Sequence, residues 1–397
     1  LKTKAYGYLR ENAELLFPLG IFFFVLFAYR FLNRHQCVSL HYFVPLADAF
    51  FHGRLNVLEH PSWLNELVPF HGKFFVVYPP MPAVVLMPFM LLWGKGMNQA
   101  FVSVILGALS VYLVYFLLYN LGFSLKKRVF FSLFFAFGTI FWYSAQNGSS
   151  WHFAQMCATT FMLLAILETQ EGKRPWLMGL FLGCAALSRL PTLMAFPFFL
   201  LFLLQEKKEK KEVLIAWLQF GAVLSLFMGL YLLYNFLRFG SFFNTGYSLI
   251  PGLMQEYQYR YGFLSLHSVG RNLYALFLKT PNFVENLPYL QATKLGGMSI
   301  LLTTPLFLWA IKARGRDALT VGCWLAVALI SVPILMHSDP GGEQFGYRYA
   351  QDFYPFLFLL TMQSLRGRVS FEQGVAIGLG LLVNAWGMWS TLVNFWG

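Results

Sequence analysis

The stretch "QAFVSVILGALSVYLVYFLLYNL", residues 99–121, contains no charged residue. A helix of about 20 apolar residues is long enough to cross the ~30 Å hydrocarbon layer of a bilayer. Because lipid offers the backbone no hydrogen-bond partners, such a run must form a helix or part of a closed barrel. The apolar residues here are continuous rather than alternating with polar ones, so the stretch predicts a membrane-spanning helix.

Similar runs recur along the whole chain. Its 397 residues are 58% hydrophobic, 19% aromatic and only 12% charged, whereas a soluble domain has about a quarter charged residues. We therefore predict an all-α, polytopic transmembrane helical bundle with about eleven to thirteen spans, forming one domain over residues 1–397. The clearest predicted helices are 15–33, 99–121, 129–145, 151–169, 213–238, 297–312, 317–336, 353–365 and 371–396.

Two other apolar regions are irregular. Residues 81–94 form a short run after a Pro-Pro pair, and residues 176–204 are split by Ser188-Arg189-Leu190-Pro191. The first run, Leu15 to Leu32, lacks a following small-x-small cleavage site and is expected to be a retained helix. The four cysteines have no motif spacing, which favours small buried residues over a disulfide or metal framework; they are Cys37, Cys157, Cys184 and Cys323.

The net charge of +12 is distributed in a way that argues against nucleic-acid binding. Basic residues concentrate in short breaks between apolar runs, the pattern of cytoplasmic loops that face anionic lipid. These breaks contain Lys126 to Arg128, Lys173-Arg174, Lys207 to Lys211, Lys312 to Arg316, and Arg366 with Arg368.

With the basic breaks inside, the other breaks lie outside. Segment 34–80 becomes the first extracytoplasmic loop and segment 239–296 a second, long one. Residues 81–121 must then cross the membrane only once. Either 81–94 enters the membrane and returns, or Lys126 to Arg128 is an exception to the charge rule.

The first outer loop contains "HYFVPLADAFFHGRLNVLEHPSWLNELVPFHGKFFVVYPPMPAVV", residues 41–85, with three carboxylates. Pro45 predicts the start of a short helix lying at the membrane interface, on which Asp48 and His52 share a face. An ionisable group beside apolar surface is by default a functional candidate. The alternative is that Asp48 pairs locally, for example with Arg54. Glu66 is predicted to be a second carboxylate of the same site.

Five stretches together resemble the C-type glycosyltransferases, integral membrane enzymes that use lipid-phosphate-linked sugars. The nearest branch is that of the protein mannosyltransferase and aminoarabinose transferase relatives. The stretches are "LADAFFHGRL" at 46–55, "GKFFVVYPPMPAVVLMP" at 72–88, "GLFLGCAALSRLPTLMAFP" at 179–197, "RFGSFFNTGYSL" at 238–249 and "FGYRYAQDFYPFLFLL" at 345–360.

The resemblance implies the C-type fold and a catalytic carboxylate in the first outer loop, which maps to Asp48. Many relatives carry an adjacent acidic pair there, whereas this chain has Ala47-Asp48-Ala49. In this interpretation Asp48 removes the proton of an acceptor that attacks C1 of the sugar, with inversion. The departing phosphate needs fixed cations in a site of low dielectric.

Arg348 is the first candidate for that cation, because a guanidinium binds phosphate through two parallel hydrogen bonds. Arg189 is the second candidate, although it equally suits an arginine that extends to the interface. Lys73 is a weaker third. Asp352 is expected to orient Arg348. The candidate substrate-binding residues are His52, Tyr78, Asn244, Tyr247 and Tyr347, although 244–247 is equally typical of a plain helix-exit turn.

The sequence thus predicts a glycosyltransferase of the inner or plasma membrane, with its site on the extracytoplasmic face. It would transfer a sugar from a polyprenyl-phosphate donor to a lipid, glycan or protein acceptor. The alternative is a transporter or flippase of lipid-linked saccharides. No cofactor is predicted; Asp48 with Glu66 could hold a divalent cation, but their spacing does not require one.

Overall fold

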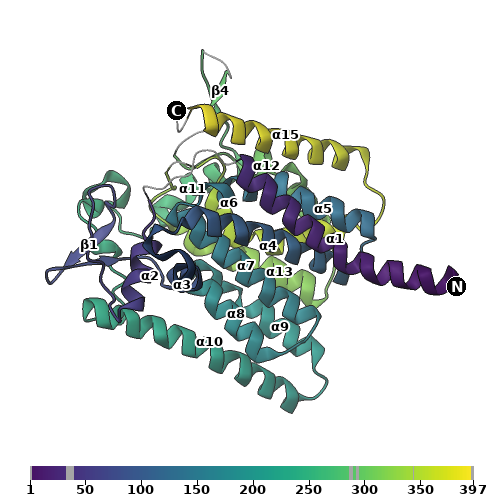
Figure 1. Cartoon of the computed structure of the whole chain (residues 1–397), viewed down its shortest axis with the longest axis horizontal. Helices are drawn as coiled ribbons and strands as arrows, with labels where there is room; N and C mark the ends of the chain where they lie inside the picture. The colour runs from purple at the N-terminus through teal and green to yellow at the C-terminus, as the bar shows by residue number, and fades with distance from the viewer. Residues whose placement is uncertain (1, 33–39, 286–288, 292–294, 343, 395–397) are drawn as a thin grey trace.

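The apolar runs form an all-α bundle, shown in Figure 1. The computed structural model describes residues 2–32, 40–285, 289–291, 295–342 and 344–394. Within these ranges, side chains are described from residue 16 to residue 390. Cys37 lies outside the described residues. The longer helices are α1 (Lys2–Leu32), α4 (Gln99–Asn120), α7 (Ser150–Gln170), α10 (Lys210–Phe239), α13 (Ala318–Met336) and α15 (Phe371–Asn394).

Shorter elements connect these helices. The shorter α-helices are α2 (Phe43–Phe51), α3 (Met81–Trp93), α5 (Leu125–Phe137), α6 (Phe141–Asn147), α8 (Pro175–Ala186), α9 (Phe196–Glu206), α11 (Val269–Phe277), α12 (Ile300–Thr303) and α14 (Tyr354–Ser364). The 3-10 helices are η1 (Gly94–Gly96), η2 (Leu190–Ala195), η3 (Tyr247–Leu249), η4 (Leu253–Gln255), η5 (Tyr257–Tyr259), η6 (Leu266–Ser268), η7 (Pro305–Lys312) and η8 (Arg348–Asp352). Two antiparallel hairpins pair β1 (Leu67–Phe70) with β2 (Lys73–Val76), and β3 (Asn282–Phe283) with β4 (Leu290–Gln291).

Four helices of the described residues are long and apolar enough to cross a membrane: α4, α7, α10 and α13. The bent pair α5–α6 would be a fifth. Shorter apolar helices cover Leu16–Leu32, Met81–Gly96, Pro175–Ala186 and Leu190–Glu206. By this criterion the described chain has fewer spans than the eleven to thirteen predicted, because breaks cut several apolar runs below ~20 residues.

Two predicted helices are interrupted, each for a local reason. Run 129–145 is divided into α5 and α6, which meet at a bend of 57°. At the bend the Thr139 hydroxyl donates to the Phe135 carbonyl at 2.9 Å and accepts from the Phe141 amide at 3.1 Å, replacing helical bonds. Run 297–312 has only four α-helical residues, since Pro305 has no N–H to continue the helix.

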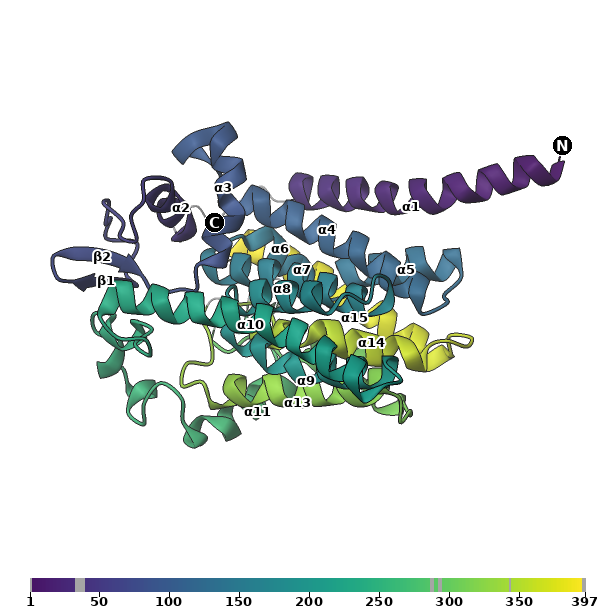
Figure 2. The same cartoon turned by 90° about the horizontal axis from the view of Figure 1, so that it is seen from below.

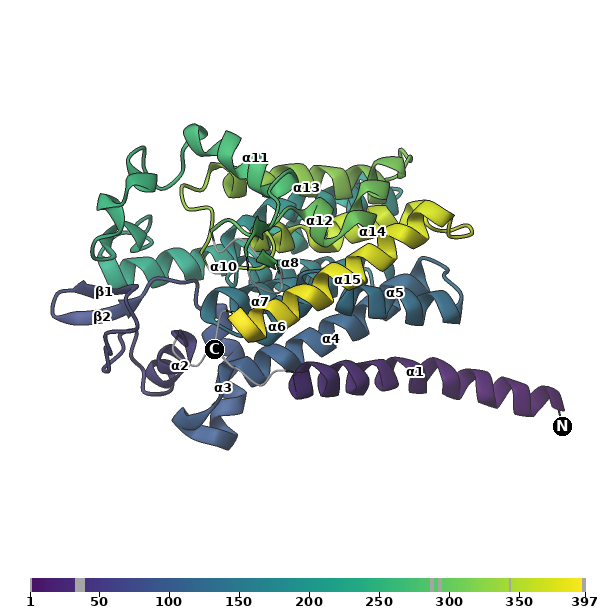
Figure 3. The same cartoon turned by 90° about the horizontal axis from the view of Figure 1, so that it is seen from above.

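Helix α7 lies in the interior of the bundle and packs against α4 and α8. Helix α10 covers α8, α1 covers α4, and α13 packs on α9. Figure 1 shows α10 and α15 on opposite sides of the molecule. Figures 2 and 3 show the β1–β2 hairpin at one end of the bundle and the N-terminus of α1 beyond the other. The described cysteines are buried, as predicted; they are Cys157, Cys184 and Cys323.

Hydrogen bonds gather the basic breaks at one end of the bundle, hereafter the basic end (residues 120–128, 171–174, 205–211, 312–318 and 365–370). Lys127 donates to the Arg366 carbonyl at 3.3 Å. Lys173 donates to Glu206 at 2.7 Å. The Ala318 amide donates to the Gln205 side chain at 2.6 Å. Asn120 donates to Glu171 at 3.2 Å, so these separate basic loops lie at one end of the bundle.

The opposite end, hereafter the site end, joins the segments between the other helix termini. The Ser150 amide donates to the Leu40 carbonyl at 3.0 Å. The Met298 amide donates to the Phe345 carbonyl, also at 3.0 Å. Arg271 donates to the Ser338 carbonyl. Both long polar segments, 40–80 and 240–299, thus adjoin this end of the bundle.

Segment 81–98 leaves the site end and returns to it. The Met81 amide donates to the Leu187 carbonyl at 3.0 Å, just before the Arg189 break. At the other end of the segment, Gln99 donates to the Gly148 carbonyl at 2.8 Å. Helix α3 therefore does not cross the bundle, and the loop with Lys126 to Arg128 lies at the basic end without an exception to the charge rule.

This path predicts which sites share a side of the membrane. In a chain with Cys37 replaced by serine, Lys95→Cys and Leu58→Cys should react with a membrane-impermeant maleimide from the same side. Lys208→Cys should react only from the opposite side, because it lies at the basic end. All three native positions are exposed, so reactivity reports sidedness. If Lys95→Cys and Lys208→Cys react from the same side of the membrane, segment 81–98 does not return to the site end.

Candidate functional site

Asp48 lies on α2, a short helix whose apolar side is buried against α3. The helix begins at Phe43, two residues before the predicted start at Pro45. As predicted, Asp48 and His52 share a face: His52 Nδ1 lies 3.5 Å from the carboxylate and 2.8 Å from the Asp48 carbonyl oxygen.

The other charged neighbours of Asp48 are Arg54 at 3.5 Å and Lys95 at 3.2 Å. Its carboxylate thus links α2 to η1, and only 13% of the side chain is exposed. This is the local pairing that the sequence left as the alternative. The expectation that Asp48 faces the arginines of the later segments is not met by these contacts, because α2 directs it toward Arg54 and Lys95.

Glu66 is positioned by the β1–β2 hairpin, which begins at the next residue. The hairpin turn places His71 and Gly72 at positive φ, +47° and +71°, as a tight type I′ turn requires. Lys73 is exposed at the tip of this hairpin, at the opposite end of the strands from Glu66. Tyr78 follows the second strand and returns to the side of Glu66.

Glu66 and Tyr78 meet at Trp151, in the first turn of α7. The indole Nε1 lies 3.2 Å from Glu66 Oε2 and 2.7 Å from the Tyr78 hydroxyl oxygen, so both can accept its N–H. The Glu66 amide also donates to the Tyr42 hydroxyl at 3.1 Å. Glu66 is therefore held at two points: its backbone amide bonds to Tyr42, and its carboxylate bonds to Trp151 of α7.

Arg348 lies on the same tryptophan. Its guanidinium carbon is 5.3 Å from the Trp151 ring centre and 5.1 Å from that of Tyr349, within the range of a cation–π contact. Gln155 fixes the backbone by donating to the Arg348 carbonyl at 2.7 Å. Arg348 is buried, and its Nε and Nη1 have no hydrogen-bond partner among the described residues. We call Glu66, Tyr78, Trp151, Arg348 and Tyr349 the Glu66 cluster.

Arg189, by contrast, already has a carboxylate partner. It donates to Asp352 from Nη2 at 2.9 Å and from Nε at 3.2 Å. Asp352 is fully buried, whereas 21% of the Arg189 side chain is exposed. The expectation that Asp352 orients Arg348 is wrong, because the 3-10 geometry of η8 directs it to the break between α8 and η2. Arg189 still adjoins the cluster, 5.4 Å from the Tyr349 ring centre.

The predicted substrate-binding residues divide into two groups. Tyr247 lies beside the cluster, with its ring centre 6.2 Å from that of Tyr78. Tyr347 is fully buried and packs edge-on against Tyr349. Asn244 accepts from the Gly246 amide at 2.9 Å, which is the helix-exit turn considered as its alternative. His52 belongs with Asp48, outside the cluster.

The electrostatics single out Glu66. It is half-buried by accessible surface, yet enclosed enough that burial raises the pKa of its carboxyl to about 7. The Trp151 hydrogen bond and the Arg348 charge lower that pKa, whereas the charges of Asp339 and Glu256 raise it. A carboxyl that is partly protonated near neutral pH is suited to exchange a proton with a ligand.

Trp151 and Tyr349 complete the cluster, although the sequence did not single them out as binding residues. Trp151 follows the polar break "QNGSS", residues 146–150, which was the signal for it in the sequence. Tyr349 lies between Arg348 and Asp352 in "GYRYAQD", residues 346–352, and this position was the signal for it in the sequence. Within the described residues, no group of three or more His, Cys, Asp and Glu side chains is arranged to hold a metal ion.

Comparison of the chain with protein-family models, with curated proteins and with solved structures finds no match. The geometry of the Glu66 cluster is therefore the basis for assigning a function. It offers a proton acceptor, a guanidinium with unused donors and an aromatic surface within one small region. That combination suits a polar ligand with an anionic part.

Proposed function

We propose that this protein is a membrane glycosyltransferase of the C-type class, transferring a sugar from a polyprenyl-phosphate donor to an acceptor. One observation carries the proposal: Glu66 and Arg348 both contact Trp151, one as a carboxylate of raised pKa and one as a guanidinium with free N–H groups. A base and an anion-binding group are the two functions that such a transfer requires.

Of the two predicted carboxylates, we assign the general base to Glu66. In its ionised form Glu66 accepts the proton of an acceptor hydroxyl or amine as that group attacks C1 of the sugar. The bond from C1 to the phosphate oxygen breaks in the same step, so the anomeric centre inverts. Asp48 is then a positioning residue that holds α2 against η1 through Lys95 and pairs with Arg54, which follows α2 in the chain.

Arg348 binds the anionic phosphate of the donor and continues to hold it as the phosphate departs. It is better suited than Arg189, whose charge is already paired with Asp352. The half-buried Trp151 supplies aromatic surface for a sugar ring, and Tyr78 and Tyr247 pack beside it. The site end would face the extracytoplasmic side of the inner or plasma membrane, with a lipid, glycan or protein as acceptor.

The direct test is reconstitution of the protein in liposomes with a radiolabelled polyprenyl-phosphate sugar and an acceptor extract. We expect label to move from the lipid to the acceptor fraction. Movement of intact sugar lipid across the bilayer without transfer would instead favour a flippase and overturn the proposal. Heat-inactivated protein gives the background for both measurements.

Arg348→Gln should raise the KM for the donor by roughly 10- to 100-fold, because a hydrogen bond to a charged group contributes about 1.5–3 kcal/mol. Arg348→Lys should recover only part of this loss, since an ammonium cannot form two parallel bonds to phosphate. The control is Arg368→Gln, which removes an exposed arginine at the basic end. Equal KM values for Arg348→Gln and this control would exclude Arg348 from donor binding.

A further inference from the structure

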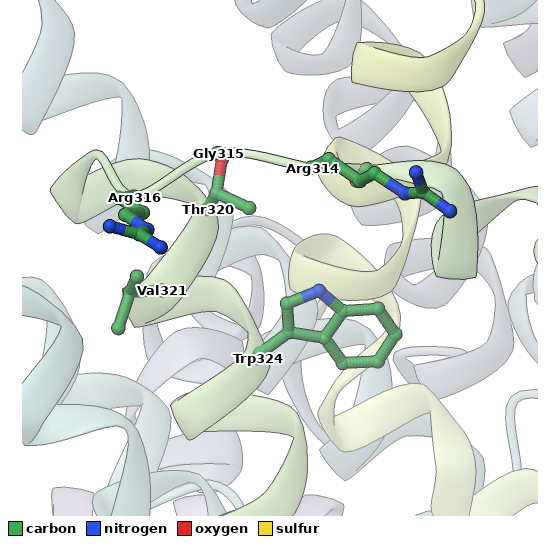
Figure 4. Close-up of a pocket in the computed structure, with 7 residues that line it drawn as sticks. Arg314, Gly315, Arg316, Thr320, Val321 and Trp324 are labelled. Carbon is green, nitrogen blue, oxygen red and sulfur yellow. The ribbon is translucent and has the colours of Figure 1, made fainter.

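A second candidate site lies at the basic end, away from the Glu66 cluster. A cavity of about 590 Å³ opens between the end of η7 and the first turns of α13. Figure 4 shows Arg316 above Val321 on one side, Arg314 on the other side, and the Trp324 indole below. Its lining residues are Ala313, Arg314, Gly315, Arg316, Thr320, Val321 and Trp324.

The rim of this cavity carries a net positive charge, with two arginines against the single carboxylate of Asp317, which lies beside Gly315. Arg314 and Arg316 are exposed, and no ion pair involves either of them among the described residues. The nearest carboxylate in sequence, Asp317, is engaged in capping α13: it accepts from the Thr320 amide and from the Thr320 hydroxyl, both at 2.9 Å. Two guanidinium groups therefore remain available to an anion.

The wall below the rim is apolar and continues down the bundle. Val321 and Trp324 are 44% and 36% exposed. With Ala328 and Val332 they form one exposed face of α13, at the spacing of successive helical turns. Helix α13 is one of the helices long enough to cross a membrane, so this face would contact lipid chains.

We propose that this cavity binds an anionic phospholipid. Its phosphate lies between Arg314 and Arg316, and its acyl chains follow the exposed face of α13 past Val321 and Trp324. Arginine side chains near the membrane surface attract anionic lipid, and an indole is favoured at that depth. A free phosphate or nucleotide would leave the apolar wall uncovered. The proposal is independent of glycosyl transfer.

The test measures lipid retention by native mass spectrometry of purified protein titrated with phosphatidylglycerol or phosphatidylcholine. We expect wild type to prefer phosphatidylglycerol, and the double variant Arg314→Gln/Arg316→Gln to bind it roughly 10- to 30-fold more weakly, given roughly fivefold per basic residue near a membrane surface. The matched control is Lys208→Gln/Lys211→Gln, two exposed lysines of the adjacent basic loop. Equal losses in both double variants would overturn the site in favour of general charge attraction.

Two further arms separate the lipid from its phosphate. Trp324→Ala should weaken phosphatidylglycerol binding several-fold because it removes the apolar wall and leaves both arginines. Inorganic phosphate at millimolar concentration should displace little lipid from wild type. Full displacement by inorganic phosphate, together with an unchanged Trp324→Ala variant, would identify a plain anion site and contradict the proposal. Retained folding of each variant is checked by its circular dichroism spectrum.

Discussion

Glu66→Gln is expected to reduce the rate of sugar transfer by roughly 100- to 10,000-fold, the usual contribution of a positioned general base. The amide keeps the size of the side chain and can still accept the Trp151 N–H that lies 3.2 Å away. It cannot take a proton at neutral pH. The loss should therefore appear in kcat, measured with the radiolabelled polyprenyl-phosphate sugar, while the KM for the donor changes little.

Two matched variants make this result decisive. Glu59→Gln removes an exposed carboxylate of the same loop and should leave transfer within about twofold of wild type, as expected for a surface site. Asp48→Asn tests the assignment made from the sequence. If Asp48→Asn abolishes transfer and Glu66→Gln does not, the base is Asp48 and the proposed role of Glu66 is wrong.

The pH dependence separates loss of the base from loss of the fold. Wild-type transfer should rise with pH through about 7, as the Glu66 carboxyl ionises. Burial raises the pKa of the Glu66 carboxyl in the folded state. The stability that the protonated carboxyl contributes is therefore complete below its ordinary pKa of 4.5, and it is lost as the pH rises through about 7. Glu66→Gln should therefore gain stability relative to wild type between pH 5 and pH 8, by thermal unfolding in detergent, while remaining inactive.

Asp352→Asn should lower the free energy of unfolding by about 3 kcal/mol, because it leaves the Arg189 guanidinium without its carboxylate. This loss is at the low end for a buried pair, since 21% of the Arg189 side chain can reach solvent whereas Asp352 is fully buried. The break between α8 and η2 would lose its attachment to η8. Denaturant unfolding in detergent micelles, followed by circular dichroism, measures the difference.

The free energy of unfolding of a variant in an exposed ion pair provides the comparison. Lys173 and Glu206 are 2.7 Å apart at the basic end, with 41% and 31% of their side chains exposed. Lys173→Gln should therefore cost less than about 1 kcal/mol. The double variant Arg189→Met/Asp352→Leu should recover most of the stability lost in Asp352→Asn, because it leaves no unpaired charge. If Asp352→Asn lowers the free energy of unfolding by no more than Lys173→Gln does, the buried pair does not hold the two segments together.

The sequence by itself determined the class of the fold and most of its long helices. An uninterrupted apolar run such as 99–121 is a local signal, and the structure has a helix there, at Gln99–Asn120. The same holds for the Ser188-to-Pro191 break, where α8 ends and a 3-10 helix begins. Length, hydropathy and proline act on neighbouring residues, so they can be evaluated without knowing the packing.

Only the tertiary structure decided which charged groups share a site. Asp48 and Glu66 lie in one loop, yet α2 turns Asp48 toward Lys95 while the hairpin directs Glu66 to Trp151, 85 positions away. Asp352 pairs with Arg189 across 163 positions rather than with Arg348, its neighbour along the chain. Side-chain pairing depends on how helices pack and on the backbone geometry of each turn, and no local pattern encodes either of these.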